Sequence, residues 1–105
     1  MRVAVDLAAE ADIAEAADFY DEQEAGLGAE VEAFLIECLA RFETLAGIPP
    51  NIRGIYRQMI SRGRFPYFVV YYEILKGSEV LVRAVQDHRR DPHDITEKID
   101  DRFTP

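Results

Sequence analysis

The sequence predicts a single α+β domain spanning residues 1–105, in which a helical hairpin packs on one face of a small antiparallel-rich sheet. The expected element order is β-α-α-β-β-β. A chain of 105 residues has room for one hydrophobic core. Its apolar residues recur with helical spacing before residue 47 and with strand spacing after residue 50, and these two periods distinguish helix from strand. Pro49 and Pro50 separate the two regions.

The first half predicts one short strand and two helices. Residues 2–7, RVAVDL, are rich in β-branched residues and are typical of a strand. A helix is then expected to run from Ala8 to about Glu24, because its apolar stripe repeats at i, i+3, i+4 and i+7: Ile13, Ala16, Ala17 and Tyr20. Gly26-Leu27-Gly28 interrupts the pattern, and a second helix with the same spacing follows, carrying Val31, Phe34, Leu35, Cys38, Leu39, Phe42, Leu45 and Ala46. So short a loop makes the two helices an antiparallel hairpin.

The second half predicts a three-stranded meander. Residues 55–60 form the first strand, residues 61–64 a turn, and Phe65-Pro66 leads into a strand over residues 67–75. This strand is apolar on both faces and is therefore placed at the centre of the sheet. A turn at residues 76–78 precedes a last strand over residues 79–86. Ile95, Ile99 and Phe103 recur at i, i+4 and i+8 and predict a short terminal helix. The sheet face away from the hairpin is covered by this tail, by a partner, or by nothing.

Composition narrows the class of protein. No apolar run approaches the ~20 residues of a membrane span, and the acids Asp6 and Glu10 come too early for a signal peptide. The single cysteine, Cys38, lies on an apolar helix face and suits a reducing compartment. We therefore expect a cytoplasmic protein. Its net charge is −8, yet residues 1–50 hold twelve acids and two bases while residues 51–105 hold eight acids and ten bases. This asymmetry predicts either a two-sided molecule or simply two differently solvated surfaces.

The layout resembles the RelE/ParE superfamily of type II toxins, also called plasmid-stabilisation proteins, over nearly the whole chain. Four stretches carry the resemblance: Ala11-Asp12-Ile13 with Phe19-Tyr20, then Gly26-Leu27-Gly28, Arg64-Phe65-Pro66-Tyr67, and Val85 with His88-Arg89-Arg90-Asp91-Pro92. The resemblance implies a toxin that needs no cofactor and is neutralised by a cognate antitoxin. RelE-like members cut messenger RNA on the ribosome without a metal, whereas ParE-like members poison DNA gyrase. The last three stretches are ParE-like, which favours gyrase as the target.

The ribonuclease alternative needs a proton acceptor, a proton donor and cations around the phosphate. Its candidate residues are Arg57, Arg64, Arg83, His88 and Arg89. Arg57 and Arg83 lie on strands that flank the central one and are placed on one sheet face. Arginine is a poor proton donor at neutral pH, and no tyrosine follows Tyr72, so this alternative has little acid–base apparatus. Outside it, direct binding of nucleic acid is not expected.

Residues 87–94 form the most polar cluster, and four interpretations compete for it. A metal site would use His88, Asp91, His93 and Asp94, but two histidines five residues apart across a proline do not share a helix face. Arg89 and Arg90 suit a phosphate, although Asp87 and Asp91 flank them. The cluster is otherwise the solvated end of a strand that stops at Gln86, or a protein contact. The target-binding candidates are Arg64, His88, Arg89 and Arg90, and no metal site is predicted.

For the antitoxin, the sequence predicts an apolar groove on the helical hairpin formed by Ile13, Phe19 and Leu27. The acidic outer surface of the hairpin would attract a basic antitoxin segment. A third hypothesis is a degenerate family member that binds its antitoxin without being toxic.

Overall fold

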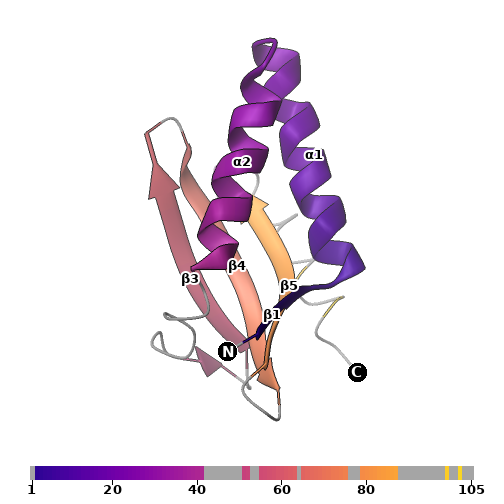
Figure 1. Cartoon of the computed structure of the whole chain (residues 1–105), viewed down its shortest axis with the longest axis vertical. Helices are drawn as coiled ribbons and strands as arrows, with labels where there is room; N and C mark the ends of the chain where they lie inside the picture. Colours follow the sequence, from indigo (N-terminus) through magenta and orange to yellow (C-terminus); the bar gives the residue numbers. More distant parts are fainter. Residues whose placement is uncertain are drawn as a thin grey trace.

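The computed structural model shows two helices packed as a hairpin against one face of a sheet (Figure 1). It describes residues 2–41, 51–52, 55–63, 65–75, 79–87, 99 and 102. The elements are β1 (Arg2–Val5), α1 (Leu7–Gln23), α2 (Leu27–Ala40), β2 (Asn51–Ile52), β3 (Ile55–Arg62), β4 (Phe65–Leu75) and β5 (Glu79–Asp87). The α+β order expected from the sequence is therefore confirmed.

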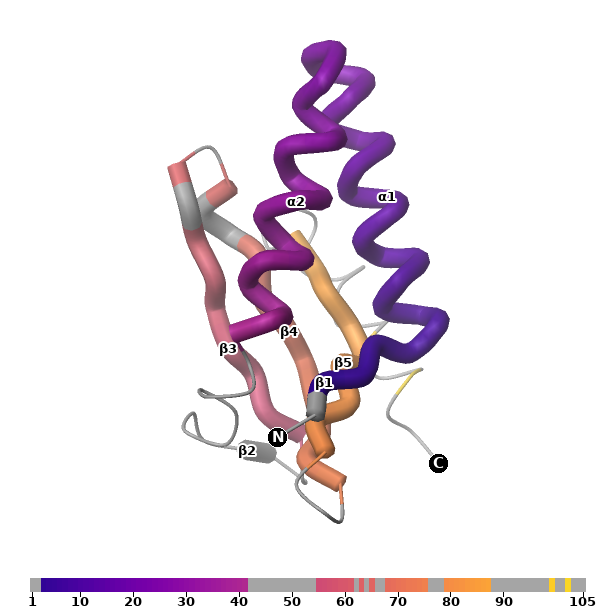
Figure 2. The backbone as a smooth tube through the Cα atoms, in the orientation of Figure 1, coloured from indigo at the N-terminus to yellow at the C-terminus, as the bar shows by residue number. Residues whose placement is uncertain are grey.

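The sheet has the strand order β1-β5-β4-β3-β2, which brings the first and last strands side by side (Figure 2). β3, β4 and β5 form the antiparallel meander, with β4 at its centre. β1 pairs parallel to β5 over four residue pairs, from Arg2–Glu79 to Val5–Val82. Because β1 ends there, the remainder of β5 beyond Val82 has no strand on its outer side among the described residues.

Local chemistry fixes where each helix begins. Asp6 caps α1, since its Oδ1 accepts a hydrogen bond of 2.9 Å from the Ala9 amide. Gly26 precedes α2 with φ of 89°, a conformation that favours glycine. At Gly28 a Cβ atom would lie 2.4 Å from the carbonyl oxygen of Ala17, so only glycine lets the two helices approach this closely. The Gly-Leu-Gly pattern thus serves both the turn and the packing of the hairpin.

The main core lies between the hairpin and the sheet. Four aromatic rings form its centre: Tyr20 and Phe34 from the helices, and Phe65 and Phe68 from β4. The rings of Tyr20 and Phe65 meet edge to face at 5.2 Å between centroids, and those of Phe34 and Phe65 stack at 5.7 Å. The sequence placed the strand over residues 67–75 at the centre of the sheet, and the aromatic residues Phe65, Phe68, Tyr71 and Tyr72 of β4 are all buried.

A second, smaller apolar cluster lies on the sheet face away from the hairpin. It contains Val69 and Tyr71 from β4 and Ala84 from β5, with Ile55 and Ile99 packed against it. Ile99 belongs to the C-terminal segment, so part of this segment covers the second face, as one of the three expectations had it. Ile95 and Phe103, the other two residues of the expected terminal helix, lie outside the described residues.

A β-bulge interrupts β5 at Arg83. Tyr72 pairs with Val82 and Tyr71 pairs with Ala84, so Arg83 is an extra residue without a partner on β4. Such a bulge redirects the side chain it carries, and it places Arg83 where three segments meet, as described below.

Some predicted boundaries were wrong. β3 continues to Arg62, so the turn consists of fewer residues than expected, with Gly63 at a φ of 50°. β5 includes Asp87 rather than ending at Gln86, because Asp87 still pairs with Phe68. β2 was not predicted, since two residues carry no periodic signal. The expected continuation of α2 through Phe42, Leu45 and Ala46 lies outside the described residues.

Candidate functional site

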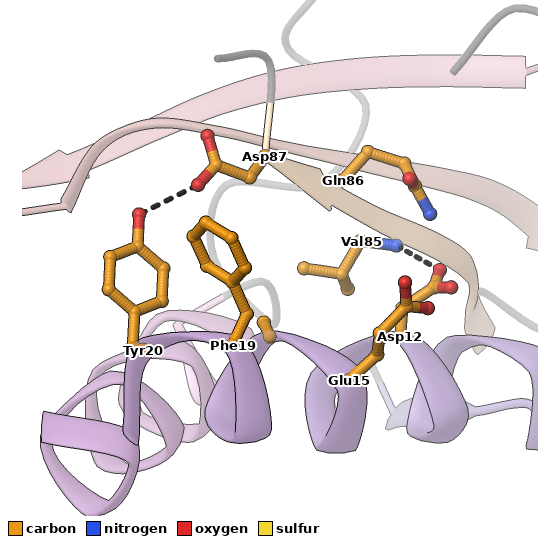
Figure 3. A pocket seen from close by; sticks show the side chains of 8 residues that line it. Asp12, Glu15, Phe19, Tyr20, Val85, Gln86 and Asp87 are labelled. Atoms are coloured by element: carbon orange, nitrogen blue, oxygen red, sulfur yellow. Dashed lines mark hydrogen bonds between the residues drawn. The ribbon is translucent and has the colours of Figure 1, made fainter. Parts of the chain in front are cut away.

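Side chains from α1 occupy the outer edge of β5 beyond the end of β1 (Figure 3). The Asp12 carboxylate accepts a hydrogen bond of 2.9 Å from the Val85 amide, and the Tyr20 hydroxyl donates one of 2.7 Å to Asp87 Oδ2. Asp12, Tyr20 and Asp87 are each buried. A buried amide left unpaired destabilises a fold, so Asp12 performs for Val85 what a neighbouring strand would.

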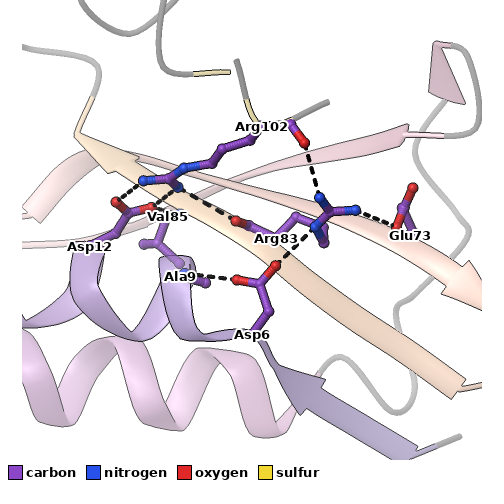
Figure 4. Close-up of polar contacts among 7 residues, drawn as sticks. All are labelled: Asp6, Ala9, Asp12, Glu73, Arg83, Val85 and Arg102. Atoms are coloured by element: carbon purple, nitrogen blue, oxygen red, sulfur yellow. Dashed lines mark hydrogen bonds and ion pairs between the residues drawn. The ribbon is translucent and has the colours of Figure 1, made fainter. Parts of the chain in front are cut away.

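The same Asp12 carboxylate also binds Arg102, a residue of the C-terminal segment (Figure 4). Its two terminal nitrogens contact the two carboxylate oxygens, with 2.7 Å between Nη2 and Oδ1. The hydrogen bond to Asp12 is the main cause that raises the pKa of Arg102 above its ordinary value, against the opposing effect of burial. Asp12 therefore joins α1, β5 and the C-terminal segment at one point.

Arg83 lies next to this contact, and each nitrogen of its guanidinium has a partner. Nε is 2.9 Å from Asp6 Oδ2, Nη1 is 2.9 Å from Glu73 Oε2, and Nη2 donates to the carbonyl oxygen of Arg102 at 3.0 Å. The side chains of Arg83, Asp6 and Glu73 are each about a quarter exposed. A phosphate bound by Arg83 would have to displace two carboxylates. This geometry disfavours Arg83 as a ribonuclease residue.

Arg57 lies on the second sheet face, because its register partner Tyr71 belongs to the apolar cluster there. It is exposed on β3 and pairs in register with Tyr71 on β4. Burial raises the pKa of the Tyr71 phenol above its ordinary value of 10.0, and the charge of Arg57 and its hydrogen bond to the phenol lower it in part. Tyr71 is thus a neutral hydrogen-bonding group beside an exposed cation.

We expect this burial to make the fold lose stability in alkali. The folded chain holds the Tyr71 proton more tightly than the unfolded chain does. The resulting stabilisation is fully present below the pKa of an unfolded tyrosine, about 10, and is lost as the pH rises through the higher pKa of the folded protein. Urea unfolding between pH 8 and 11 should show a smaller alkaline loss for Tyr71→Phe than for the wild type. Parallel curves for the two proteins would contradict this expectation.

An apolar hollow with a volume of ≈ 450 Å³ opens between β1 and the two helices. Val3, Val5, Ile13, Ala14, Ile36, Leu39 and Ala40 line it, together with Glu10 and Glu32. Ile36 is 56% exposed, which is unusual for an isoleucine with buried neighbours. The hollow therefore combines an apolar surface with two carboxylates.

The three antitoxin candidates do not form one groove. Ile13 lines the apolar hollow, whereas Phe19, 39% exposed, lines a separate small hollow beside Tyr20 and Asp87. Leu27 is only 8% exposed and belongs to the main core. The described residues do not show the expected groove, because Leu27 is packed into the core and Phe19 lines a different hollow from Ile13.

The remaining predicted site residues cannot be located in this fold. Arg64, His88, Arg89 and Arg90 lie outside the described residues, as do Asp91, His93 and Asp94 of the hypothetical metal cluster. Their roles stay predictions.

Asp12 and Arg102 are the residues that sequence reasoning missed. Asp12 stood in a stretch that carried the family resemblance, but it also lies on the helix face of Ile13 and Tyr20, where an acid breaks the apolar stripe. A buried acid requires a partner. The position of Asp12 on the apolar stripe therefore predicts a cationic partner, but it does not say which residue that partner is. Ninety residues separate Asp12 from Arg102, so periodicity could not pair them.

The fold as a whole resembles that of a solved structure. No family model matches the chain, and no curated protein is significantly similar to it. Among solved structures, a chain of the "Chromosomal ParDE TA system from P. aeruginosa" superposes with a TM-score of 0.70 at 16% sequence identity. The match covers 83% of this chain and 95% of that one. The chain shares the fold of this ParDE-system chain.

The shared fold covers nearly the full length of the matched chain, which confirms the architecture that the sequence resemblance implied. At 16% identity the similarity concerns the fold, and activity has to be argued separately. In the described part of the chain no helix is long and apolar enough to cross a membrane.

Proposed function

We propose that this protein is the toxin of a type II toxin–antitoxin pair, acting in the cytoplasm and neutralised by a cognate antitoxin. The observation that carries the proposal is the superposition on a chain of a ParDE system over 95% of that chain's length. The ParE-like sequence stretches support a further step, in which the toxin acts by binding DNA gyrase rather than by catalysis. The engagement of Arg83 by Asp6 and Glu73 weakens the ribonuclease alternative, because it removes one of the cations that the chemistry requires.

Induced expression of the chain alone in a bacterium should arrest growth and activate a DNA-damage reporter. Purified protein should inhibit supercoiling by gyrase in vitro. Phe68→Ala, which removes a core ring, serves as a control for the burden of expression. Normal growth with abundant soluble protein would contradict the toxin proposal. Cleavage of translated messages without DNA damage would instead support the ribonuclease alternative.

For the antitoxin we propose the apolar hollow between β1, α1 and α2 as a contact surface. The hollow offers Ile13 and Ile36 to apolar side chains, and Glu10 and Glu32 to cations. An amphipathic segment with Lys or Arg beside its apolar residues matches this chemistry. The proposal keeps Ile13 from the sequence prediction and does not require Phe19 or Leu27.

We expect Ile36→Glu to weaken antitoxin binding by roughly tenfold or more, because one well-packed apolar contact is worth about 1.5–3 kcal/mol and the new carboxylate would have to lose its hydration against an apolar partner. The probe is the protein encoded by the neighbouring reading frame, titrated by calorimetry. Met59→Glu is the matched control, since Met59 is 65% exposed and lies on β3 away from the hollow. Equal loss of affinity in both variants would contradict the assignment of this surface. Tight binding by a protein that does not arrest growth would indicate a degenerate toxin.

A further inference from the structure

Arg57 and Met59 form an exposed pair on the second sheet face. They lie two residues apart on β3, so their side chains share a face. Their register partners Tyr71 and Val69 belong to the apolar cluster on that face. Met59 is 65% exposed and Arg57 is also exposed, although Ile99 already packs on the cluster. This part of the face is therefore accessible to a partner without any rearrangement.

The charge of Arg57 is not neutralised within the described part of the chain. None of the ion pairs there involves Arg57, and its hydrogen bond goes to the phenol of Tyr71. Glu73, two residues along β4 from Tyr71, binds Arg83 instead. Charge complementarity therefore favours an anionic group supplied by a partner.

Gln86 adds a hydrogen-bond donor to the same row of residues. Val69 pairs with Met59 on one side and with Gln86 on the other, and directly opposite residues of paired strands share a face. Gln86 is 2% exposed, and among the described residues its Nε2 has no hydrogen-bond partner. A buried donor without an acceptor is costly, and such a group in a native fold requires an explanation. An acceptor oxygen supplied by a partner provides one.

The chemistry of this face suits a carboxylate of a protein better than the phosphates of RNA. Binding to a nucleic-acid backbone relies on several cations, and Arg83 is already bound by Asp6 and Glu73. In the described part of the face, Arg57 stands beside the apolar Met59 rather than beside a second available cation. Arginine and methionine are both enriched at protein interfaces, where the unbranched methionine side chain adapts to irregular surfaces.

We propose that this face binds an acidic protein segment, in which a carboxylate pairs with Arg57, a neighbouring apolar side chain packs on Met59, and an oxygen accepts from Gln86. The surface is separate from the hollow that contains Ile36, which lies between β1 and the two helices. A partner on this face and an antitoxin in the hollow can therefore bind at the same time. The inference goes beyond the toxin proposal and does not depend on which target the toxin has.

Methionine NMR gives a direct readout of this face. The chain contains two methionines, Met1 and Met59, so protein labelled with ¹³C at the methionine methyl groups gives one signal from the face. The probes are short peptides selected on the purified protein from a random library displayed on phage. Selection should enrich Asp or Glu beside Leu, Ile or Phe, and the selected peptides should shift the Met59 signal. Poly(U) RNA should leave that signal unchanged.

Four substitutions locate the contact by calorimetry with the selected peptides. Arg57→Glu and Met59→Glu should each weaken binding by roughly tenfold or more. Ile36→Glu, in the hollow, is the matched control and should leave the affinity unchanged. Gln86→Met keeps the approximate size of the side chain without its amide. It should weaken peptide binding without lowering the midpoint of urea unfolding, because it removes a donor that has no acceptor in the free protein.

The competing outcomes are distinct. A selection without acidic peptides, or peptides that bind Arg57→Glu as tightly as the wild type, would overturn the proposal. A Met59 signal that moves with RNA and not with the peptides would assign the face to phosphate binding and overturn it as well. A lower urea midpoint for Gln86→Met with unchanged peptide affinity would show that the amide serves the fold and has no part in the contact. These measurements use the purified protein alone, so their result is independent of whether the chain arrests growth.

Discussion

Asp12→Ala is expected to reduce the free energy of unfolding by about 3–5 kcal/mol, since it breaks a buried ion pair by removing one partner. The substitution leaves the Arg102 guanidinium without the carboxylate that binds it on two oxygens, and it leaves the Val85 amide without its acceptor. For a domain whose total stability is about 5–15 kcal/mol, this is a large share. Chemical denaturation followed by circular dichroism measures it.

Two further variants serve as controls for this expectation. Asp12→Asn retains an acceptor for Val85 but not the charge, so its loss of stability should fall between those of the wild type and Asp12→Ala. Glu37→Ala removes an acid from the exposed pair with Arg41, and it should change the stability by no more than about 0.5 kcal/mol. If Asp12→Ala and Glu37→Ala were equally mild, Asp12 would have no structural role of the kind described.

Phe68→Ala is expected to have a comparable effect through a different mechanism. Phe68 is 1% exposed, and its ring lies 6.2 Å from that of Tyr20 and 6.3 Å from that of Phe34. Removing it opens a cavity beside the aromatic rings of both helices, which costs about 3–5 kcal/mol. Phe68→Leu, which retains most of the volume, should lose clearly less. A similar loss for the two variants would show that the site collapses around the missing ring.

The two substitutions should also differ in where they act. Phe68 belongs to the core under the hairpin, whereas Asp12 connects the hairpin to the edge of β5 and to Arg102. Because the two residues share no direct contact in the described hydrogen bonds and ring pairs, the effects of a double variant should be close to additive. Strong coupling would instead mean that the Asp12–Arg102 ion pair and the aromatic core form one cooperative unit.

The fold was largely predictable because it depends on short-range patterns. Ile13, Ala16 and Tyr20 follow the helical period, and the continuous apolar run from Phe65 to Leu75 marks a central strand. The pairing of β1 with β5 could be expected only from the family resemblance, since the two strands are separated by most of the chain.

The candidate site was less predictable, for physical reasons that particular residues make clear. Arg83 looked like a phosphate ligand in the sequence, but a bulge directs it toward Asp6 and Glu73. A bulge arises from the way two strands pair, so the sequence of one strand alone does not reveal it. Leu27 looked exposed at the end of a glycine turn, and the close approach of the helices at Gly28 buries it. In both cases the outcome was set by tertiary contacts between distant segments.

The short length of β1 has a consequence for how this sheet can grow. Beyond Val82 the outer edge of β5 is occupied by Asp12 and Arg102, so a strand from another polypeptide cannot add there without displacing them. On the other side, β2 pairs only with Ile55 and Tyr56, and among the described residues the rest of β3 has a strand on one side alone. Arg57, at the start of that stretch, is the type of charged side chain that discourages edge-to-edge association. Of the described edges, β5 beyond Val82 is therefore closed to a second chain by Asp12 and Arg102, and Arg57 disfavours the addition of one at β3.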